Sequence, residues 1–359
     1  MSELVALLSL LATTILLTWA VAAWVLSRAK ELRLVQVPNH RSSHVRPTPT
    51  GGGLGFVVAG SLAGIALTLR FDWWLGGWVA ALAAVLAAVG LYDDVADLSA
   101  PARLGVQVVV SAGLLLVLGD LPSLTLSEGG GLLAGWLLFG LLLLASLWWI
   151  NLFNFMDGID GIAGMQAIFM LFAGAALAAW VVPEAMYSPA WMWMLCVAAG
   201  SAGFLWLNWP PAKIFMGDVG STWLAFMVFA LALLSVQAGW LSYAAWLVLA
   251  AVFVTDATVT LLTRVLRGER WYEAHRSHVY QRLSRRWPGS RKAGHRSVTL
   301  LVTVVNGLWL APWAWACVQW PSKSVLFVVA AYAPLVLAVI WLGAGRPDPL
   351  LSADKRLRG

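Results

Sequence analysis

Long apolar runs recur along the whole sequence, and they limit the folds that this chain can adopt. A helix needs about 20 predominantly apolar residues to cross a bilayer. Because lipid offers the backbone no hydrogen-bond partners, such runs fold as helices. The sequence therefore predicts an all-α polytopic membrane protein with about eleven transmembrane helices. The predicted spans are residues 4–26, 53–69, 73–91, 104–118, 132–150, 161–182, 190–208, 221–237, 241–262, 298–318 and 324–343.

The composition agrees with a membrane protein and excludes several soluble classes. Charged residues make up 11% of the 359 residues, against about 25% in an average soluble domain. The net charge of +6 does not by itself identify a partner, and we expect no nucleic acid to bind. Both cysteines, Cys196 and Cys317, lie inside apolar runs, which argues against a disulfide framework or a cysteine metal site.

The basic residues predict how the chain lies in the membrane. Cytoplasmic loops carry an excess of Lys and Arg, and all but two of the 23 basic residues, Arg70 and Lys323, fall in alternate loops. The first run has no Lys or Arg before it, unlike a cleaved signal peptide. We therefore expect a periplasmic N-terminus, a cytoplasmic C-terminus and long basic loops in the cytoplasm. No linker divides residues 1–359, which we interpret as one membrane domain.

Acidic and amide side chains gather at the predicted cytoplasmic ends of the spans. Asp93, Asp94 and Asp97 follow the third span, and Asp93 and Asp97 would share a face if the helix continues. Adjacent carboxylates favour a cation or a proton role. A solvated helix end is the alternative for this segment. Asp218 stands between two glycines where the eighth span begins, a position that suits a metal-bound diphosphate or a simple helix cap.

A second acidic motif, NLFNFMDGIDG, repeats a polar residue every three positions between apolar neighbours. In a 3₁₀-like turn, residues three apart eclipse one another. We therefore expect all four polar side chains to project toward one side. Helix capping could explain one of them but not four in register. The four residues are Asn151, Asn154, Asp157 and Asp160.

Two basic loops complete the set of polar segments. The segment PNHRSSHVRPTPTGGG combines basic and hydroxyl side chains, including Arg46 and Thr50, with glycines that let backbone amides approach a phosphate; a turn before a helix is the equal alternative. The loop RGERWYEAHRSHVYQRLSRR contains His275 and His278 without a third zinc ligand. A phosphate-facing role beside Arg276 and Arg282 fits this loop better.

Together, PTPTGGG, LYDDVADL, NLFNFMDGIDGIAG, FMGDVGS and HRSHVYQRL resemble, in this order, the polyprenyl-phosphate N-acetylhexosamine-1-phosphate transferases, glycosyltransferase family 4. The resemblance runs from about Pro38 to Leu283. It implies ten or eleven helices and a cytoplasmic active site formed by loops 28–52, 92–103, 151–160, 209–220 and 264–297. It also implies transfer of a sugar 1-phosphate from a UDP-N-acetyl-sugar to undecaprenyl phosphate, with release of UMP, in the bacterial inner membrane.

The resemblance also implies roles for individual residues. Asp93, Asp94 and His278 match catalytic positions, and Asp218 matches the ligand of Mg²⁺, with Mn²⁺ as an alternative ion. Asp160 would lie on the uracil side, with Phe215 stacking on the base. The expected substrate-binding residues are Asn151, Asn154, Asp157, Asp160, Phe215, Lys213, Arg276, Thr50 and Arg46.

One departure from the family pattern bears on the sugar. Relatives that transfer phospho-GlcNAc or phospho-muramoyl-pentapeptide carry more histidines after the position of His278, where this chain has Val279, Tyr280 and Gln281. The variant resembles the branch that initiates O-antigen and lipopolysaccharide synthesis, including enzymes of deoxy-sugars. The sequence leaves open which UDP-sugar is used, whether an Asp forms a covalent intermediate, and whether the protein is a homodimer.

A transporter is the alternative from another class of protein. Transporters place coupling residues near the bilayer midplane, often in broken helices. Here the polar motifs lie at the cytoplasmic ends of the predicted spans, and only Asp256 falls inside one. This placement favours an enzyme that works on a membrane lipid at the cytoplasmic surface.

Overall fold

The computed structural model describes residues 2–36, 47–125, 132–269 and 275–347, and most of them are helical. Two short antiparallel pairs, β1 (Val35–Gln36) with β2 (Thr48–Pro49) and β3 (Leu124–Thr125) with β4 (Leu132–Leu133), lie in connecting segments. The α-helices are α1 (Ser2–Arg28), α2 (Leu54–Arg70), α3 (Trp74–Ala96), α4 (Ala100–Leu118), α5 (Gly135–Met156), α6 (Ile162–Val181), α7 (Pro189–Asn208), α8 (Gly217–Gln237), α9 (Tyr243–Leu249), α10 (Ala251–Leu266), α11 (Val279–Arg286), α12 (Arg291–Val305), α13 (Ala311–Gln319) and α14 (Ser324–Trp341).

The predicted all-α polytopic class is confirmed. Among the described residues, nine helices are long and apolar enough to cross a membrane, and α9 with α10 makes a tenth if the bent pair is one span. The shorter apolar helix α2 covers the remaining predicted run. One of the nine joins α12 and α13 through a π-helical segment, Asn306–Leu310.

The run at 241–262 is not the single helix that we expected. It breaks at Ala250 into α9 and α10, which are bent by 73° relative to each other. A break frees backbone carbonyls that lipid cannot satisfy. The side chain of Gln166, on α6, donates a hydrogen bond to the carbonyl of Leu249 (3.1 Å) and so stabilises the break.

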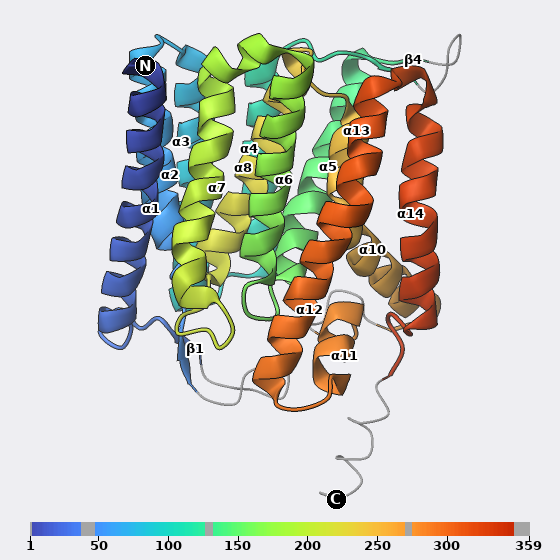
Figure 1. The fold of residues 1–359 in the computed structure, drawn as a ribbon. Helices are drawn as coiled ribbons and strands as arrows, with labels where there is room; N and C mark the ends of the chain where they lie inside the picture. Colours follow the sequence, from blue (N-terminus) through green and yellow to red (C-terminus); the bar gives the residue numbers. More distant parts are fainter. Residues whose placement is uncertain (1, 37–46, 126–131, 270–274, 348–359) are drawn as a thin grey trace, which may run out of the picture.

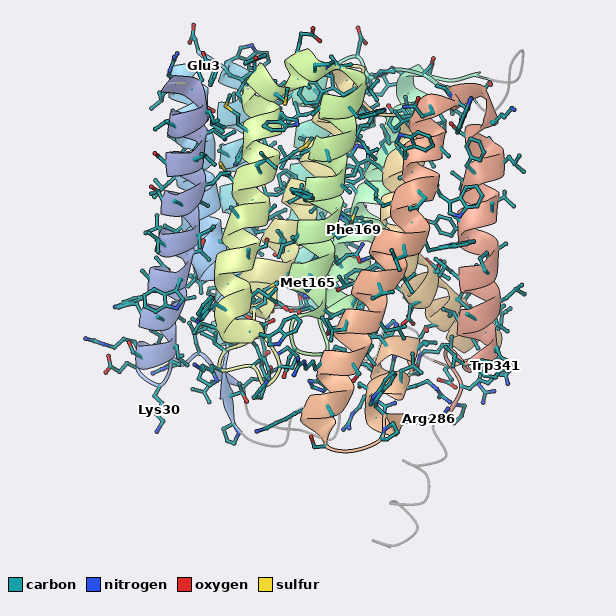
Figure 2. All side chains as sticks on the ribbon, viewed as in Figure 1. Glu3, Lys30, Met165, Phe169, Arg286 and Trp341 are labelled. Carbon is teal, nitrogen blue, oxygen red and sulfur yellow. The ribbon has the colours of Figure 1, made fainter. Side chains whose placement is uncertain are left out.

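The helices form an upright bundle whose two ends differ (Figure 1). Helix α1 begins at one end and α14 finishes at the other. Figure 2 places Glu3 at the first end and Lys30 and Arg286 at the second. Large apolar side chains such as Leu116 and Trp206 are exposed on the sides of the bundle, as expected of a lipid-facing surface.

Helix α8 is the central helix of the bundle. Nearly all of its side chains are buried, and α2, α3, α5, α6 and α7 pack around it. Two glycines permit the closest approaches near its N-terminus. A Cβ atom on Gly90 of α3 would lie 2.7 Å from the carbonyl oxygen of Asp218 and from Cα of Val219, and a Cβ on Gly53 would overlap Gly220. The backbones of α2 and α3 therefore touch the start of α8.

We predict that Gly90→Ala destabilises the protein by about 1–3 kcal/mol, because two helix backbones must separate to admit one methyl group. The measurement is the midpoint of thermal unfolding in detergent. Gly105→Ala in α4 is the matched control, since no described atom lies within 4 Å of its added Cβ and Ala favours a helix over Gly. Equal unfolding midpoints for the two variants would contradict the close packing at Gly90.

Candidate active site

A cavity of about 680 Å³ lies where α3, α5 and α7 end and α8 begins. Each of the five loops that we expected to form the site contributes to its lining. The lining residues are Val35, Gln36, Thr50, Asp93, Asp94, Asp97, Leu98, Arg103, Asn154, Asp157, Gly158, Ile159, Asp160, Asn208, Phe215, Met216, Gly217, Asp218, Gln281 and His295.

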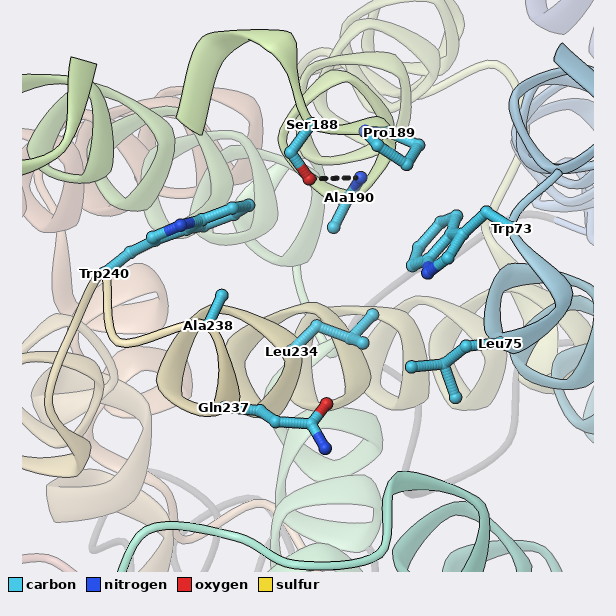
Figure 3. Close-up of a pocket in the computed structure, with 9 residues that line it drawn as sticks. All are labelled: Trp73, Leu75, Ser188, Pro189, Ala190, Leu234, Gln237, Ala238 and Trp240. Carbon is cyan, nitrogen blue, oxygen red and sulfur yellow. Dashed lines mark hydrogen bonds between the residues drawn. The ribbon is translucent and has the colours of Figure 1, made fainter. Parts of the chain in front are cut away.

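A second cavity, of about 320 Å³, lies at the other end of α8 (Figure 3). Trp73 and Trp240 form part of its wall, and Ser188 uses its hydroxyl to accept the backbone N–H of Ala190 (3.3 Å). None of its described lining residues is ionisable. Acid–base and phosphate chemistry therefore belongs to the larger cavity at the opposite end.

Asp94 fixes the N-terminus of α8 inside the larger cavity. Its two carboxylate oxygens accept the backbone N–H groups of Asp218 (2.8 Å) and Val219 (3.1 Å). The preceding Gly217 has φ +77°, and a Cβ there would lie 2.6 Å from an oxygen of Asp94, so this turn requires glycine. Asp94 therefore caps α8, and the side chain of Asp218 stays free of that task.

Arg103 joins two carboxylates that are far apart in the sequence. It donates to Oδ2 of Asp93 (2.7 Å) and lies 3.3 Å from Oδ2 of Asp218. The other oxygen of Asp218 accepts from the side-chain amide of Asn154 (2.8 Å). Asp97 does not continue α3 as we had considered: the helix ends at Ala96, and Asp97 is its left-handed C-cap. Both Asp93 and Asp97 nevertheless line the cavity.

The expected 3₁₀-like turn in the second acidic motif is wrong. Helix α5 continues to Met156, and in an α-helix residues three apart are rotated by about 60° from eclipse. Asn151 consequently points at α4, where it donates to Gln107 (2.7 Å). Asn154, Asp157 and Asp160 line the cavity, while Asn151 is absent from its described lining.

Asp157 lies among other carboxylates just beyond the end of α5. Burial, together with the charges of Asp218, Asp160 and Asp94, raises the pKa of Asp157 well above its ordinary value. Six aspartates line the cavity, and among its described lining residues only Arg103 and His295 are basic. This concentration of negative charge favours an added cation.

Asp160 connects three segments. Its Oδ2 accepts the backbone N–H of Ala212 (3.0 Å), its Oδ1 lies 3.2 Å from Nδ1 of His295, and its carbonyl accepts the hydroxyl of Thr299 (3.0 Å). Beside it, buried Asn208 accepts the N–H of Gly161 (2.9 Å) and donates to the carbonyl of Ile214 (2.9 Å). These bonds hold the loop after α5 against the loop before α8.

The predicted catalytic His278 lies outside the described lining of the cavity, and its side chain is buried. Asp256 accepts the backbone N–H groups of Val279 and Tyr280 (2.9 Å each) and so caps α11. Nδ1 of His278 lies 3.5 Å from Asp256. Tyr280 donates its hydroxyl to the carbonyl of Phe155 (2.8 Å). This arrangement attaches α11 to the end of α5.

The remaining predicted residues divide between the cavity and its surroundings. Thr50 and Phe215 line the cavity, whereas Lys213 and Arg276 are absent from its described lining. Arg46 lies outside the described residues. We did not expect Arg103, Gln281 or His295 in the lining. Arg103 could have been suspected as the single basic residue beside the aspartate pair; no local pattern marks His295.

The carboxylates of the cavity fit a hard cation only if water and substrate phosphates supply its other ligands. Among the described residues, no three His, Cys, Asp or Glu side chains are placed to hold a metal ion together. Mg²⁺ is usually held by one or two carboxylates, with waters and substrate phosphates as its other ligands. Asp218 and Asp157 are suitable carboxylates for such a shared site.

The sequence profile of glycosyl transferase family 4 matches residues 77–236. The chain is 28% identical to a probable undecaprenyl-phosphate N-acetylglucosaminyl 1-phosphate transferase of Bacillus subtilis, over 92% of this chain and 90% of the relative. It is 29% identical to an undecaprenyl-phosphate alpha-N-acetylglucosaminyl 1-phosphate transferase of Escherichia coli O157:H7, over 74% and 73%.

A third relative is named for a polyprenyl phosphate of a different chain length. The decaprenyl-phosphate N-acetylglucosaminephosphotransferase of Mycobacterium tuberculosis is 28% identical over 94% of this chain and 88% of its own length. The likeness therefore extends well beyond the stretch that contains the central helix α8.

We predict that Asn208→Leu lowers the thermal unfolding midpoint in detergent, because it leaves the N–H of Gly161 and the carbonyl of Ile214 buried without a partner. Each such loss costs about 1–3 kcal/mol. Ser201→Ala is the control in the same helix, since Ser201 donates only to the carbonyl of Val197 one turn earlier. If Asn208→Leu were no less stable than Ser201→Ala, the amide would not hold the two loops together.

Proposed function

The chain belongs to glycosyl transferase family 4, and we propose that it transfers a sugar 1-phosphate from a UDP-sugar to undecaprenyl phosphate, with release of UMP. The observation that carries this proposal is the convergence of five separate loops on one acidic cavity at the end of a membrane bundle. A lipid phosphate reaches such a site from the bilayer and a nucleotide reaches it from water. The names of the relatives support undecaprenyl phosphate as the acceptor and a sugar 1-phosphate as the group transferred.

In the proposed reaction, an oxygen of the lipid phosphate attacks the β-phosphorus of the UDP-sugar. A new P–O bond forms, the bond from the β-phosphorus to the oxygen bridging the two phosphates breaks, and UMP leaves with that oxygen. The protein's task is to position both phosphates and to balance their charge. Bound Mg²⁺, or Mn²⁺ as an alternative ion, would neutralise diphosphate charge beside Asp218 and Asp157.

The bonds of the aspartate pair suggest different tasks for its two members. Asp94 accepts two backbone N–H groups of α8, and these donors cannot turn away without unwinding the helix. Asp93 accepts the backbone N–H of Leu98 at Oδ1 (2.7 Å), but its Oδ2 is bound by the side chain of Arg103 (2.7 Å). Arg103 can rotate toward an incoming phosphate and so release Oδ2. We therefore place proton acceptance from the lipid phosphate at Asp93 and the positioning of Asp218 at Asp94.

The nucleotide half of the substrate is assigned to the other wall. Asn154, Asp157 and Asp160 line the cavity together with Phe215, which we propose stacks on uracil. Asn151 supports this wall through Gln107. His278 would act through the placement of α11, because its ring is buried. Thr50, Lys213, Arg276 and Arg46 remain candidates for phosphate contacts from the surrounding loops.

The setting of the reaction follows from the charge pattern. Lys30 and Arg286 lie at the cavity end of the bundle (Figure 2), which we propose faces the cytoplasm in the bacterial inner membrane. We propose an N-acetylhexosamine or a deoxy-N-acetylhexosamine as the sugar, and initiation of O-antigen or a related envelope glycan as the purpose. Gln281 supports sugar selection in this region, because it lines the cavity.

The direct test is release of UMP from a panel of UDP-sugars by purified protein with Mg²⁺ and undecaprenyl phosphate in detergent. We expect turnover with at least one N-acetylated sugar and none without the lipid phosphate. A transporter would release no UMP from any member of the panel, and that result would reject the proposed function.

We predict that Asp218→Asn reduces Mg²⁺-dependent turnover by about 10²-fold or more, because the amide removes the charge that would hold the ion. The protein should stay folded, since Asn can still accept from Asn154. Asp97→Asn is the control: Asp97 also lines the cavity, and Asn tolerates its positive φ of 49°. We expect a much smaller loss there. Near-normal turnover of Asp218→Asn at ordinary Mg²⁺ would remove Asp218 from the metal site.

A further inference from the structure

His295 is a buried, ionisable residue of the cavity wall that the proposed transfer reaction does not use. It comes from α12 and is only 6% exposed, although it lines the cavity. Helix α12 packs against α6 and α11, whereas α3 and α4, which carry Asp93 and Arg103, pack against α8. His295 therefore stands on a different side of the cavity from the Arg103 carboxylate group.

The contacts of the ring fix which nitrogen can serve a ligand. Nδ1 accepts the backbone N–H of Asp160 (3.4 Å) and lies 3.2 Å from Oδ1 of the same residue. In the neutral ring with Nδ1 accepting, the proton is on Nε2; in the charged ring both nitrogens carry protons and Nδ1 pairs with the carboxylate. Nε2 makes no hydrogen bond with any described residue, so in both states it is a donor available to a ligand.

Asp160 holds the ring through Nδ1, so Nε2, at the far side of the ring, presents a single N–H donor that points away from Asp160. The edge of uracil at position 4 has a carbonyl acceptor, O4. The same edge of cytosine has an amino donor instead. This edge is the part of the base most distant from the ribose. If the diphosphate lies toward Asp218 and Arg103, this edge of the base faces the wall that contains Asp160 and His295.

We propose that His295 is a base-reading residue, whose Nε2–H donates to O4 of uracil while Asp160 holds the ring through Nδ1. The inference rests on the proposed function for the identity of the nucleotide and adds a residue that selects uridine over cytidine. A polar site of this kind rejects cytosine because its N–H donor would then face an amino group, which is also a donor. Thr299, one turn further along α12, holds the carbonyl of Asp160 but is absent from the described cavity lining.

The test compares equilibrium binding of UDP and CDP, with Mg²⁺, to purified protein in detergent. His295→Asn can keep an acceptor near the position of Nδ1 but places nothing at Nε2, whereas His295→Gln can return an N–H donor near Nε2. We expect His295→Asn to raise the Kd for UDP about tenfold and to reduce the preference for UDP over CDP. His295→Gln should recover part of both.

Thr299→Val is the matched control for a purely structural role. It removes a hydrogen bond that holds Asp160 and leaves the imidazole in place, so the preference for UDP over CDP should persist. With the UDP-sugar as substrate, His295→Asn should raise KM more than it lowers kcat, because the base is remote from the reacting phosphorus. The proposal would be overturned if His295→Asn kept the wild-type preference for UDP over CDP. It would also be overturned if Thr299→Val lost that preference as much as His295→Asn.

The outcome also separates this inference from the proposed function. Wild-type protein that prefers UDP, loses the preference in His295→Asn, and releases no UMP with undecaprenyl phosphate would uphold base reading and reject the transfer reaction. Wild-type protein that transfers sugar phosphate while His295→Asn keeps its preference would reject base reading alone. Wild-type protein that binds neither nucleotide would reject both.

Discussion

The capping of α8 by Asp94 is the interaction on which the candidate site depends. A helix begins with backbone N–H groups that have no partners in the helix, and here two of them donate to a carboxylate from a different span. The bond fixes the rotation and height of α8 relative to α3. Because Asp218 occupies the first turn, its carboxylate is placed by the same bond. Gly90 and Gly217 permit this arrangement, since a side chain at either position would overlap the cap or the helix start.

Negative charge is the second feature that organises the cavity. Arg103 lies between Asp93 and Asp218 and offsets part of the repulsion among the six aspartates. Opposite it, the loop with Asp160 is held by backbone and side-chain bonds from α7 and α12. Both walls are therefore held by hydrogen bonds to the backbone, and the contacts of Arg103 with Asp93 and Asp218 are the ionic contacts that can rearrange. This combination suits a site that fixes a nucleotide and lets a phosphate move.

Much of this arrangement could be predicted from local sequence patterns. Every predicted apolar run lies at a helix or at a pair of joined helices, and the five polar loops meet at one end of the bundle. Predictions failed where tertiary contacts decide the outcome. The spacing of Asn151 and Asn154 could not show that one faces Gln107 and the other Asp218. The break at Ala250 depends on Gln166, which is 83 positions away from its partner Leu249. His295 reaches the cavity only because α12 packs beside α6.

The position of Asp218 also affects how the protein can be made. From Val219 to Val236, α8 contains no ionisable residue, so during synthesis this segment can leave the insertion machinery for lipid as an ordinary apolar helix. A carboxylate at the centre of a span would oppose that step by about 2.5–3.5 kcal/mol. Placed in the first turn, it remains at the water interface until α3 supplies its neighbours. The acidic residue that the site requires is therefore acquired without a penalty in biogenesis.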